Sequence, residues 1–153
     1  MSLFYLDSSA WLKRYFEEPG SSWMSRLFEG DDRLASSVLG YVEVASALTR
    51  QQVPRKMDEQ KLAQLRQDFK EDWTNFTGLP LTEELAELAL ALTQDHKLRG
   101  ADAVHLATAL DLRDSLAEVN ESLVVLASDH ELLEAARQAG LAVEDPVAAT
   151  SSR

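Results

Sequence analysis

The chain of 153 residues carries 15 Lys and Arg against 26 Asp and Glu, which gives a formal net charge of −11 at pH 7. Its hydrophobic content of 45% is that of a globular domain, and its lack of cysteine excludes disulfides, thiolate zinc sites and a cysteine nucleophile. No apolar run approaches the roughly 20 residues of a membrane span, so we expect a single cytoplasmic domain without a membrane segment. A chain this acidic does not hold nucleic acid with its whole surface, so such a function would need a local basic patch or bound cations.

Short apolar runs alternate with amphipathic segments along the chain, which predicts strands that alternate with helices. In chain order, the predicted strands are 3–6, 33–36, 79–81, 123–126 and 141–143. The third is the weakest, because Pro80 has no N–H group to donate. The predicted helices are 8–16, 20–29, 38–50, 58–75, 82–96, 101–117 and 130–139. Strands joined by helical crossovers pair in parallel, so we expect an α/β fold with three layers, in which helices cover both faces of a parallel sheet of about five strands.

The ends of the predicted elements carry local signals of their own. Ser9 and Thr82 are predicted to cap the N-termini of their helices, and Gly140 is predicted to follow the C-terminus of the helix at 130–139. We see no interdomain linker, and we therefore expect one domain over residues 1–147 with a flexible tail at 148–153.

Two aspartates follow predicted strands directly. Asp7 comes after the first strand and Asp129 lies just past the fourth. Ligands of open α/β sheets bind beyond the carboxyl ends of the strands, where the strand order reverses. If these two strands are neighbours, the two carboxylates converge there. Each aspartate also precedes a helix, so helix capping is the alternative interpretation for both.

Two further acids lie on predicted helices. Asp102 is in the first turn of a helix that is apolar almost all round, where either the helix dipole or a partner in a site could stabilise its charge. Glu43 points away from the apolar stripe of its helix, so periodicity by itself predicts a solvated side chain.

The chemistry of these four acids favours a cation site if they meet. Two charges 4 Å apart repel by roughly 4 kcal/mol at an effective dielectric of 20, so four carboxylates together require protons or bound cations. Carboxylate oxygens without cysteine or clustered histidine suit Mg²⁺ or Mn²⁺. Such an ion can activate a water and neutralise charge on a phosphoryl group, so the residues indicate hydrolysis of a phosphoester.

Five short motifs occur in an order that resembles a known family. They are Tyr-Leu-Asp-Ser-Ser-Ala at 5–10, Glu-Pro-Gly-Ser at 18–21, Val-Glu-Val-Ala-Ser-Ala-Leu at 42–48, Ala-Asp-Ala-Val-His-Leu-Ala-Thr-Ala at 101–109, and Ser-Asp at 128–129. Together they resemble a PIN domain, specifically the VapC-type toxins of bacterial and archaeal toxin–antitoxin pairs. The resemblance covers about residues 3–146.

The resemblance implies a PIN-like sheet whose first and fourth strands are adjacent at the centre. It also implies that Asp7, Glu43, Asp102 and Asp129 form a catalytic quartet, in which Asp7, Asp102 and Asp129 hold Mg²⁺ or Mn²⁺ and Glu43 is a further ligand or orients the water. Ser9 matches a small polar residue that supports the first acid. The family commonly has Thr or Ser where this chain has Ala127, and Ser128 follows one position later.

The activity implied by the resemblance is that of an endoribonuclease that cleaves tRNA, rRNA or mRNA. The implied partners are a cognate VapB-type antitoxin and a second copy of the chain in a homodimer. Aromatic residues are dense in the first 28 positions, and besides the core they could form a groove for an antitoxin helix.

Two alternatives keep the same fold. One is a housekeeping RNA-processing nuclease without an antitoxin, and the other is a binding or scaffold domain that hydrolyses nothing. His105, in a packed helix, is predicted to be a hydrogen-bonded core residue rather than a catalyst. The basic residues near the acidic motifs, among them Lys13 and Arg99, could either steer phosphates or belong to ordinary solvated surface.

Overall fold

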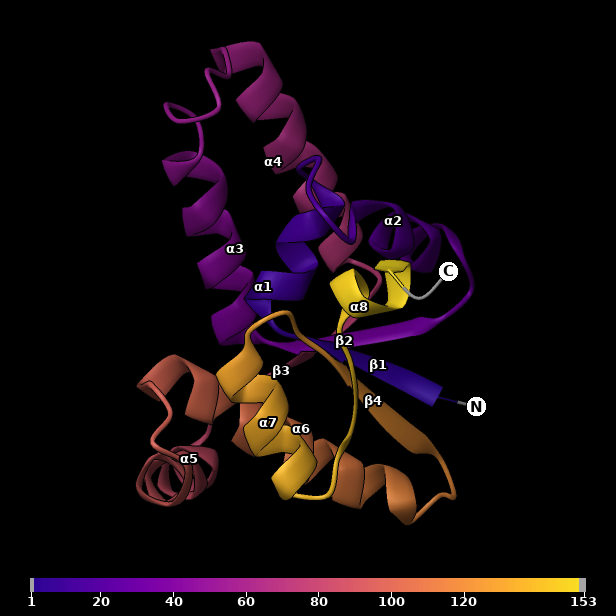
Figure 1. Ribbon diagram of the computed structural model, residues 1–153, viewed down its shortest axis with the longest axis vertical. Coiled ribbons are helices and arrows are strands. Elements are labelled where there is room, and N and C mark those ends of the chain that lie inside the picture. The colour runs from indigo at the N-terminus through magenta and orange to yellow at the C-terminus, as the bar shows by residue number, and fades with distance from the viewer. Residues whose placement is uncertain (1, 152–153) are drawn as a thin grey trace.

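The computed structural model describes residues 2–151 and contains one five-stranded parallel sheet between helices (Figure 1). The strands are β1 (Ser2–Leu6), β2 (Arg33–Ser37), β3 (Phe76–Leu79), β4 (Ser122–Leu126) and β5 (Ala142–Glu144). The helices are α1 (Ser8–Trp11), the 3₁₀ helix η1 (Leu12–Arg14), α2 (Ser21–Glu29), α3 (Val38–Arg50), α4 (Glu59–Trp73), α5 (Glu83–His96), α6 (Gly100–Ala117), α7 (His130–Gln138) and α8 (Pro146–Ser151). The predicted α/β class and parallel sheet are confirmed.

The strand order is β3-β2-β1-β4-β5, and every neighbouring pair is parallel. The first and fourth strands are therefore adjacent, as expected, with Ser2 opposite Ser122 and Leu6 opposite Leu126. From β1 the chain moves first to one side, through β2 and β3, and later to the other side, through β4 and β5. This reversal creates a topological switch point at the carboxyl ends of β1 and β4, the place where open α/β sheets bind ligands.

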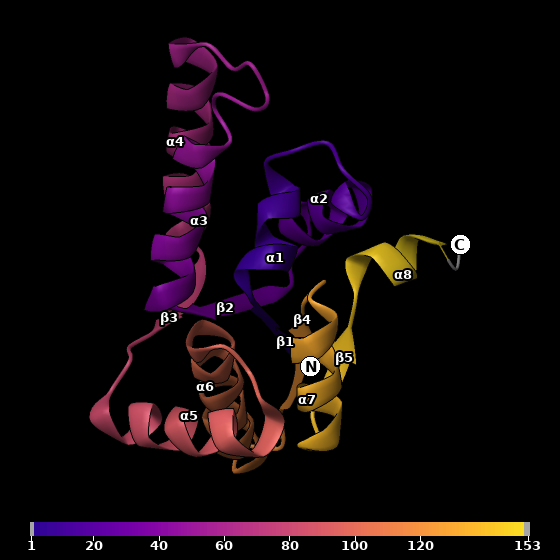
Figure 2. The same cartoon turned by 60° about the vertical axis from the view of Figure 1, so that its left-hand side comes forward.

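Helices cover the two faces of the sheet in two separate groups (Figure 2). Helices α5, α6 and α7 pack on one face around a core of leucines and alanines. Helices α1, α2, α3 and α4 pack on the other around an aromatic core, and α3 and α4 extend together beyond the sheet. The alternation of side chains along β1 separates these cores, because Tyr5 faces the first group and Phe4 and Leu6 the second.

Trp11 is at the centre of the aromatic core and is fully buried. Its ring stacks on Phe76 at 4.5 Å and on Trp73 at 5.6 Å between centroids, and its indole N–H donates to the Tyr15 hydroxyl at 3.0 Å. Tyr15, Phe16 and Trp23 are also buried. The alternative in which these aromatic residues line a groove for a partner helix is therefore wrong for the buried ones, which stabilise the fold.

Several element boundaries differ from the predictions, for local reasons. The predicted helix 8–16 is a single α-helical turn that continues into the 3₁₀ helix η1. The third strand ends at Leu79, so Pro80 lies just beyond the ladder rather than within it. Ser9 does not cap α1; Asp7 does. Thr82 caps α5, and Gly140 follows α7 with a positive φ of 89°, both as predicted.

A short C-terminal helix was not predicted. Helix α8 begins at Pro146, where proline's fixed φ suits a first helical turn, and it packs near α2. It continues into the segment expected as a tail, of which residues 152–153 lie outside the described residues. Over residues 2–151, no helix combines the length and the apolar character needed to cross a membrane.

Candidate active site

Asp7 ends β1 and begins α1, and its two carboxylate oxygens have different partners. Oδ1 accepts the Ala10 N–H at 2.9 Å and thereby caps the helix, as the capping alternative predicted. The Ser9 hydroxyl is 2.8 Å from both Oδ1 and Oδ2. Asp7 is 3% exposed, so this charge is held at the switch point with little access to water.

Asp129 has the same double arrangement at the start of α7. Its Oδ1 accepts the Leu132 N–H at 3.1 Å and caps the helix, whereas its Oδ2 lies 3.2 Å from Nη2 of Arg99. Capping and a place in a site are thus compatible for both strand-end aspartates, because a cap uses only one carboxylate oxygen.

Arg99 joins Asp129 to Asp102. Its Nε lies 3.3 Å from Oδ2 of Asp102, and the same guanidinium reaches Asp129, so one cation lies between two carboxylates from different helices. The Asp102 side chain is 12% exposed, whereas that of Arg99 is 76% exposed. The arginine therefore covers the acids from the solvent side.

Burial perturbs the two most enclosed carboxylates. Burial raises the pKa of Asp7 from 3.8 to about 6, and the charge of Asp102 contributes to this rise, whereas a positive charge on His105 and the hydrogen bonds from Ala10 and Ser9 lower the pKa. Burial, followed by the charge of Asp129, also raises the pKa of Asp102. The charge of Asp102 thus acts on Asp7, and the charge of Asp129 acts on Asp102, so we refer to these three carboxylates as the acidic cluster.

Glu43 is separate from this cluster in its hydrogen bonds. Its Oε1 lies 2.6 Å from Nε2 of His105, and its side chain is 29% exposed beside a groove between α1 and α3. The prediction from periodicity that Glu43 is solvated is therefore only partly correct: α6 covers the side of α3 from which this residue projects. His105 is 2% exposed and hydrogen-bonded, as predicted.

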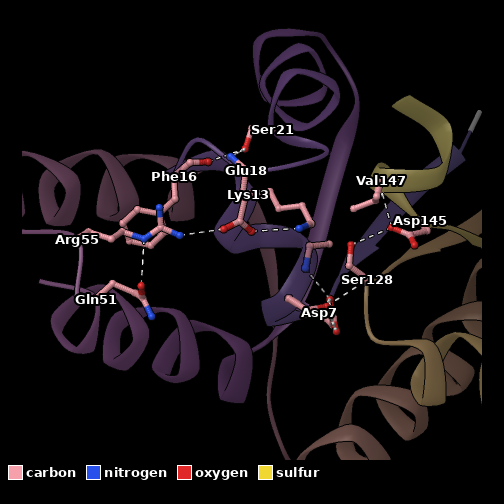
Figure 3. Close-up of polar contacts among 12 residues, drawn as sticks. Asp7, Lys13, Phe16, Glu18, Ser21, Gln51, Arg55, Ser128, Asp145 and Val147 are labelled. Carbon is pink, nitrogen blue, oxygen red and sulfur yellow. Dashed lines mark hydrogen bonds and ion pairs between the residues drawn. The ribbon is translucent and has the colours of Figure 1, made fainter. Parts of the chain in front are cut away.

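Ser9 connects the loop after β4 to Asp7. The Ser128 N–H donates to the Ser9 hydroxyl oxygen at 3.0 Å, while the Ser128 hydroxyl donates to Asp145 at 2.9 Å and points away from the acids (Figure 3). The side chain of Ser128 therefore makes no hydrogen bond to the acidic cluster. Asp145 also accepts the Val147 N–H at 2.9 Å, which links the start of α8 to this loop.

Most basic residues near the acidic motifs are already in ion pairs. Lys13 and Arg55 both bind Glu18, at 3.1 and 3.0 Å, and Arg55 also covers the ring of Phe16 (Figure 3). Arg14 is 3.4 Å from Asp72. Arg99 is also paired, with Asp102 and Asp129, whereas Arg50 lines the groove beside Glu43 and has no ion pair among the described residues.

Within residues 2–151, no three histidine, aspartate or glutamate side chains stand close enough together to hold a metal ion. The side chains bring Asp102 and Asp129 together around Arg99, link Asp7 through Ser9 to the backbone of Ser128, and turn Glu43 toward His105.

Comparisons with known proteins agree with this architecture. The PIN domain family matches residues 4–138 of the chain. The chain belongs to the PIN-domain family. It is 38% identical over 143 residues to Ribonuclease VapC45 and to Ribonuclease VapC49, both from Mycobacterium tuberculosis strains, covering 94% of this chain and 95% of each relative. A DNA-bound VapBC structure from Salmonella typhimurium shares the fold at a TM-score of 0.62 and 16% identity, over 95% of this chain and 99% of that one.

Two residues of this PIN domain acquire partners that sequence reasoning did not assign. Arg99 was predicted either to steer phosphates or to be ordinary surface, yet it binds Asp102 and also Asp129, 30 positions away. His105 lies three positions after Asp102, so both side chains project from the same side of α6. That spacing was the available signal that His105 lies near the acids.

Proposed function

We propose that this protein is a metal-dependent endoribonuclease and the toxin of a VapBC-type toxin–antitoxin pair. The observation that carries the proposal is the convergence of Asp102 and Asp129 on one cationic group, beside the buried Asp7, at the switch point of a PIN domain. The two mycobacterial relatives, which are named ribonucleases, support the same activity.

The donor chemistry of the cluster suits a hard divalent cation, although three of its side chains would have to move closer together to bind one. Their donors are all carboxylate oxygens, and two of them already share the guanidinium of Arg99, which stands where a positive charge is stabilised. We propose that Asp7, Asp102 and Asp129 hold Mg²⁺ or Mn²⁺ and that Arg99 releases the two aspartates when they do. Such an ion supplies an activated water and neutralises charge on the phosphate under attack.

The remaining groups orient and transfer protons in this proposal. Ser9 holds the carboxylate of Asp7 through both oxygens, and Glu43 accepts the proton of the attacking water. Arg99, once released, is free to bind an RNA phosphate, which offsets the repulsion between RNA and a protein of charge −11. Water attacks the phosphate directly, so the chain needs no nucleophile of its own.

The proposed partners are RNA, a VapB-type antitoxin and a second copy of the chain, in the cytoplasm. The fold shared with VapBC complexes supports the antitoxin. The second copy is proposed from the resemblance to VapC-type toxins.

Replacing Asp102 by asparagine is expected to reduce RNA cleavage by a factor on the order of 10³, because it removes the charge of a proposed metal ligand. Purified protein would be incubated with total cellular RNA and Mn²⁺, and new 5′ ends mapped by sequencing. Asp111→Asn, an exposed change on the same helix, is the matched control and should cut like the wild type. Discrete ends that survive both EDTA and Asp102→Asn would contradict the proposal.

Replacing Arg99 by glutamine is expected to tighten Mn²⁺ binding by roughly threefold to tenfold, because the exposed arginine no longer competes for two carboxylates. Cleavage at saturating Mn²⁺ should become slower, since the variant lacks the proposed phosphate contact. Isothermal titration calorimetry and single-turnover cleavage measure the two effects. Arg113→Gln removes the same charge elsewhere on α6 and should change neither. Weaker Mn²⁺ binding by Arg99→Gln would show that the arginine supports the metal site instead of competing for it.

A further inference from the structure

His105 connects the centre of the sheet to the acid at the edge of the site. Its Nδ1 lies 2.7 Å from the hydroxyl of Tyr5 on β1, and its Nε2 lies 2.6 Å from Glu43 on α3. Tyr5 is fully buried and His105 is 2% exposed, whereas the side chain of Glu43 is 29% exposed. The three groups thus form a hydrogen-bonded row that begins in the core and ends at the solvent.

The hydrogen-bond partners of Tyr5 and His105 bear on where the protons of the hydroxyl and the imidazole lie. Burial raises the pKa of the Tyr5 phenol above its ordinary value, so the hydroxyl stays protonated. Its oxygen accepts the Ser37 N–H at 3.3 Å, and its own proton is available to be donated to Nδ1 of His105, 2.7 Å away. When the Tyr5 hydroxyl is the donor to Nδ1, Nε2 carries the imidazole proton and donates it to the carboxylate of Glu43.

Packing holds the imidazole in this place. A Cβ atom at Gly40 would lie 3.2 Å from Cε1 of His105 and 2.5 Å from Oγ of Ser36, so the absence of a side chain there lets α3 approach α6 this closely. Tyr5 also contacts the imidazole edge to face, with 5.8 Å between ring centroids. The histidine therefore has little freedom to turn away from Glu43.

We propose that His105 is a positioning residue, which fixes the carboxylate of Glu43 in the orientation that accepts a proton from the attacking water. Tyr5 acts through His105, because its hydroxyl sets the tautomer of the imidazole. This inference rests on the proposed nuclease function and adds to it a residue that need not touch substrate or metal. A buried histidine could otherwise serve the fold alone, and the two roles differ in what its replacement changes.

A set of variants separates positioning from stability. His105→Leu removes the donor to Glu43 and should lower kcat by about 10-fold to 100-fold with KM within about twofold. His105→Gln places an amide N–H near the position of Nε2 and should recover most of the loss. In a Glu43→Gln background, His105→Leu should lower kcat by less than about twofold further, because both changes act through one group. Additive losses, or a His105→Leu variant that cuts as fast as the wild type, would overturn the inference.

A second measurement does not depend on cleavage. Nitrogen-15 NMR of the metal-free protein should show a proton on Nε2 of His105 that exchanges slowly with solvent, because Nε2 donates it to Glu43. Glu43→Ala should shift this signal strongly, whereas Asp111→Asn should leave it in place. A proton found on Nδ1, or a signal that is indifferent to Glu43→Ala, would overturn the inference. If the wild type cuts no RNA while the signal behaves as expected, the nuclease function fails but the contact is real.

Discussion

Replacing Asp7 by asparagine is expected to abolish RNA cleavage and, at the same time, to stabilise the folded protein above pH 6. The charge of Asp7 is needed in the proposed metal site, yet it is buried with only two hydrogen-bond donors to compensate it. Asparagine keeps an oxygen that can accept the Ala10 N–H, so α1 remains capped. The change removes the buried charge and retains the helix.

The direction of the pH dependence follows from the raised pKa. The carboxyl has a pKa of about 6 in the folded state, against an ordinary value of 3.8. Between these values the folded chain holds a proton that the unfolded chain has lost, so the free energy of unfolding falls as the pH rises through this window. The resulting loss in the free energy of unfolding is absent below pH 3.8 and complete above pH 6, where it amounts to roughly 3 kcal/mol.

Urea unfolding of wild type and Asp7→Asn at several pH values measures this effect. Without divalent ions, the free energy of unfolding of the variant should exceed that of the wild type by about 1–3 kcal/mol at pH 7.5. The two free energies should become equal near pH 4. Added Mn²⁺ should stabilise the wild type more than the variant. Asp58→Asn, at the exposed N-cap of α4, controls for the loss of one charge at a cap. An Asp7→Asn protein less stable than wild type at pH 7.5 would contradict the account.

Replacing Trp11 by alanine is expected to lower the free energy of unfolding by about 3–5 kcal/mol. The indole is fully buried and stacks on Trp73 of α4 and Phe76 of β3, so it packs α1 against both elements. Its removal leaves a cavity among aromatic rings that cannot close over it. It also leaves the buried hydroxyl of Tyr15 without the indole donor.

Urea unfolding followed by far-ultraviolet circular dichroism measures this loss. If the alanine variant does not fold, Trp11→Phe keeps a stacked ring and should lose about 1–2 kcal/mol. Val53→Ala, at a residue that is 83% exposed, is the surface control and should stay within about 0.5 kcal/mol of the wild type. A Trp11→Ala protein as stable as this control would show that the aromatic core does not hold the fold together.

The fold was predictable because its signals are local and repeated. Apolar runs separated by amphipathic stretches indicate parallel strands with helical crossovers, and residues such as Thr82 and Gly140 mark helix ends through their own backbone chemistry. The weaker predictions failed where the local signal was ambiguous. Ser9 and Asp7 are both suitable N-caps two positions apart, and only the direction in which the chain leaves β1 decides that Asp7 is the cap.

The candidate site was predictable only in part. Strand-end positions indicated Asp7 and Asp129 as residues of the switch point, and the place of Asp102 in the first turn of a packed helix made it a candidate as well. The resemblance added Glu43, which periodicity by itself predicted to be solvated. Whether Asp7, Asp102 and Asp129 bind a metal stays a prediction. The role of Ser128 was not predictable. Its hydroxyl donates to Asp145, which directly precedes the unpredicted helix α8.

The sequence by itself determined the order of strands and helices, the acidic charge, and the three acids that follow strands or begin a helix, Asp7, Asp102 and Asp129. Only the tertiary structure decided which groups those acids face. Arg99 lies between two acids because α6 and α7 start side by side, and His105 reaches Glu43, 62 positions away, because α3 packs on α6 at Gly40. Periodicity reports how a helix is buried on average, whereas a contact between two side chains depends on how their helices cross.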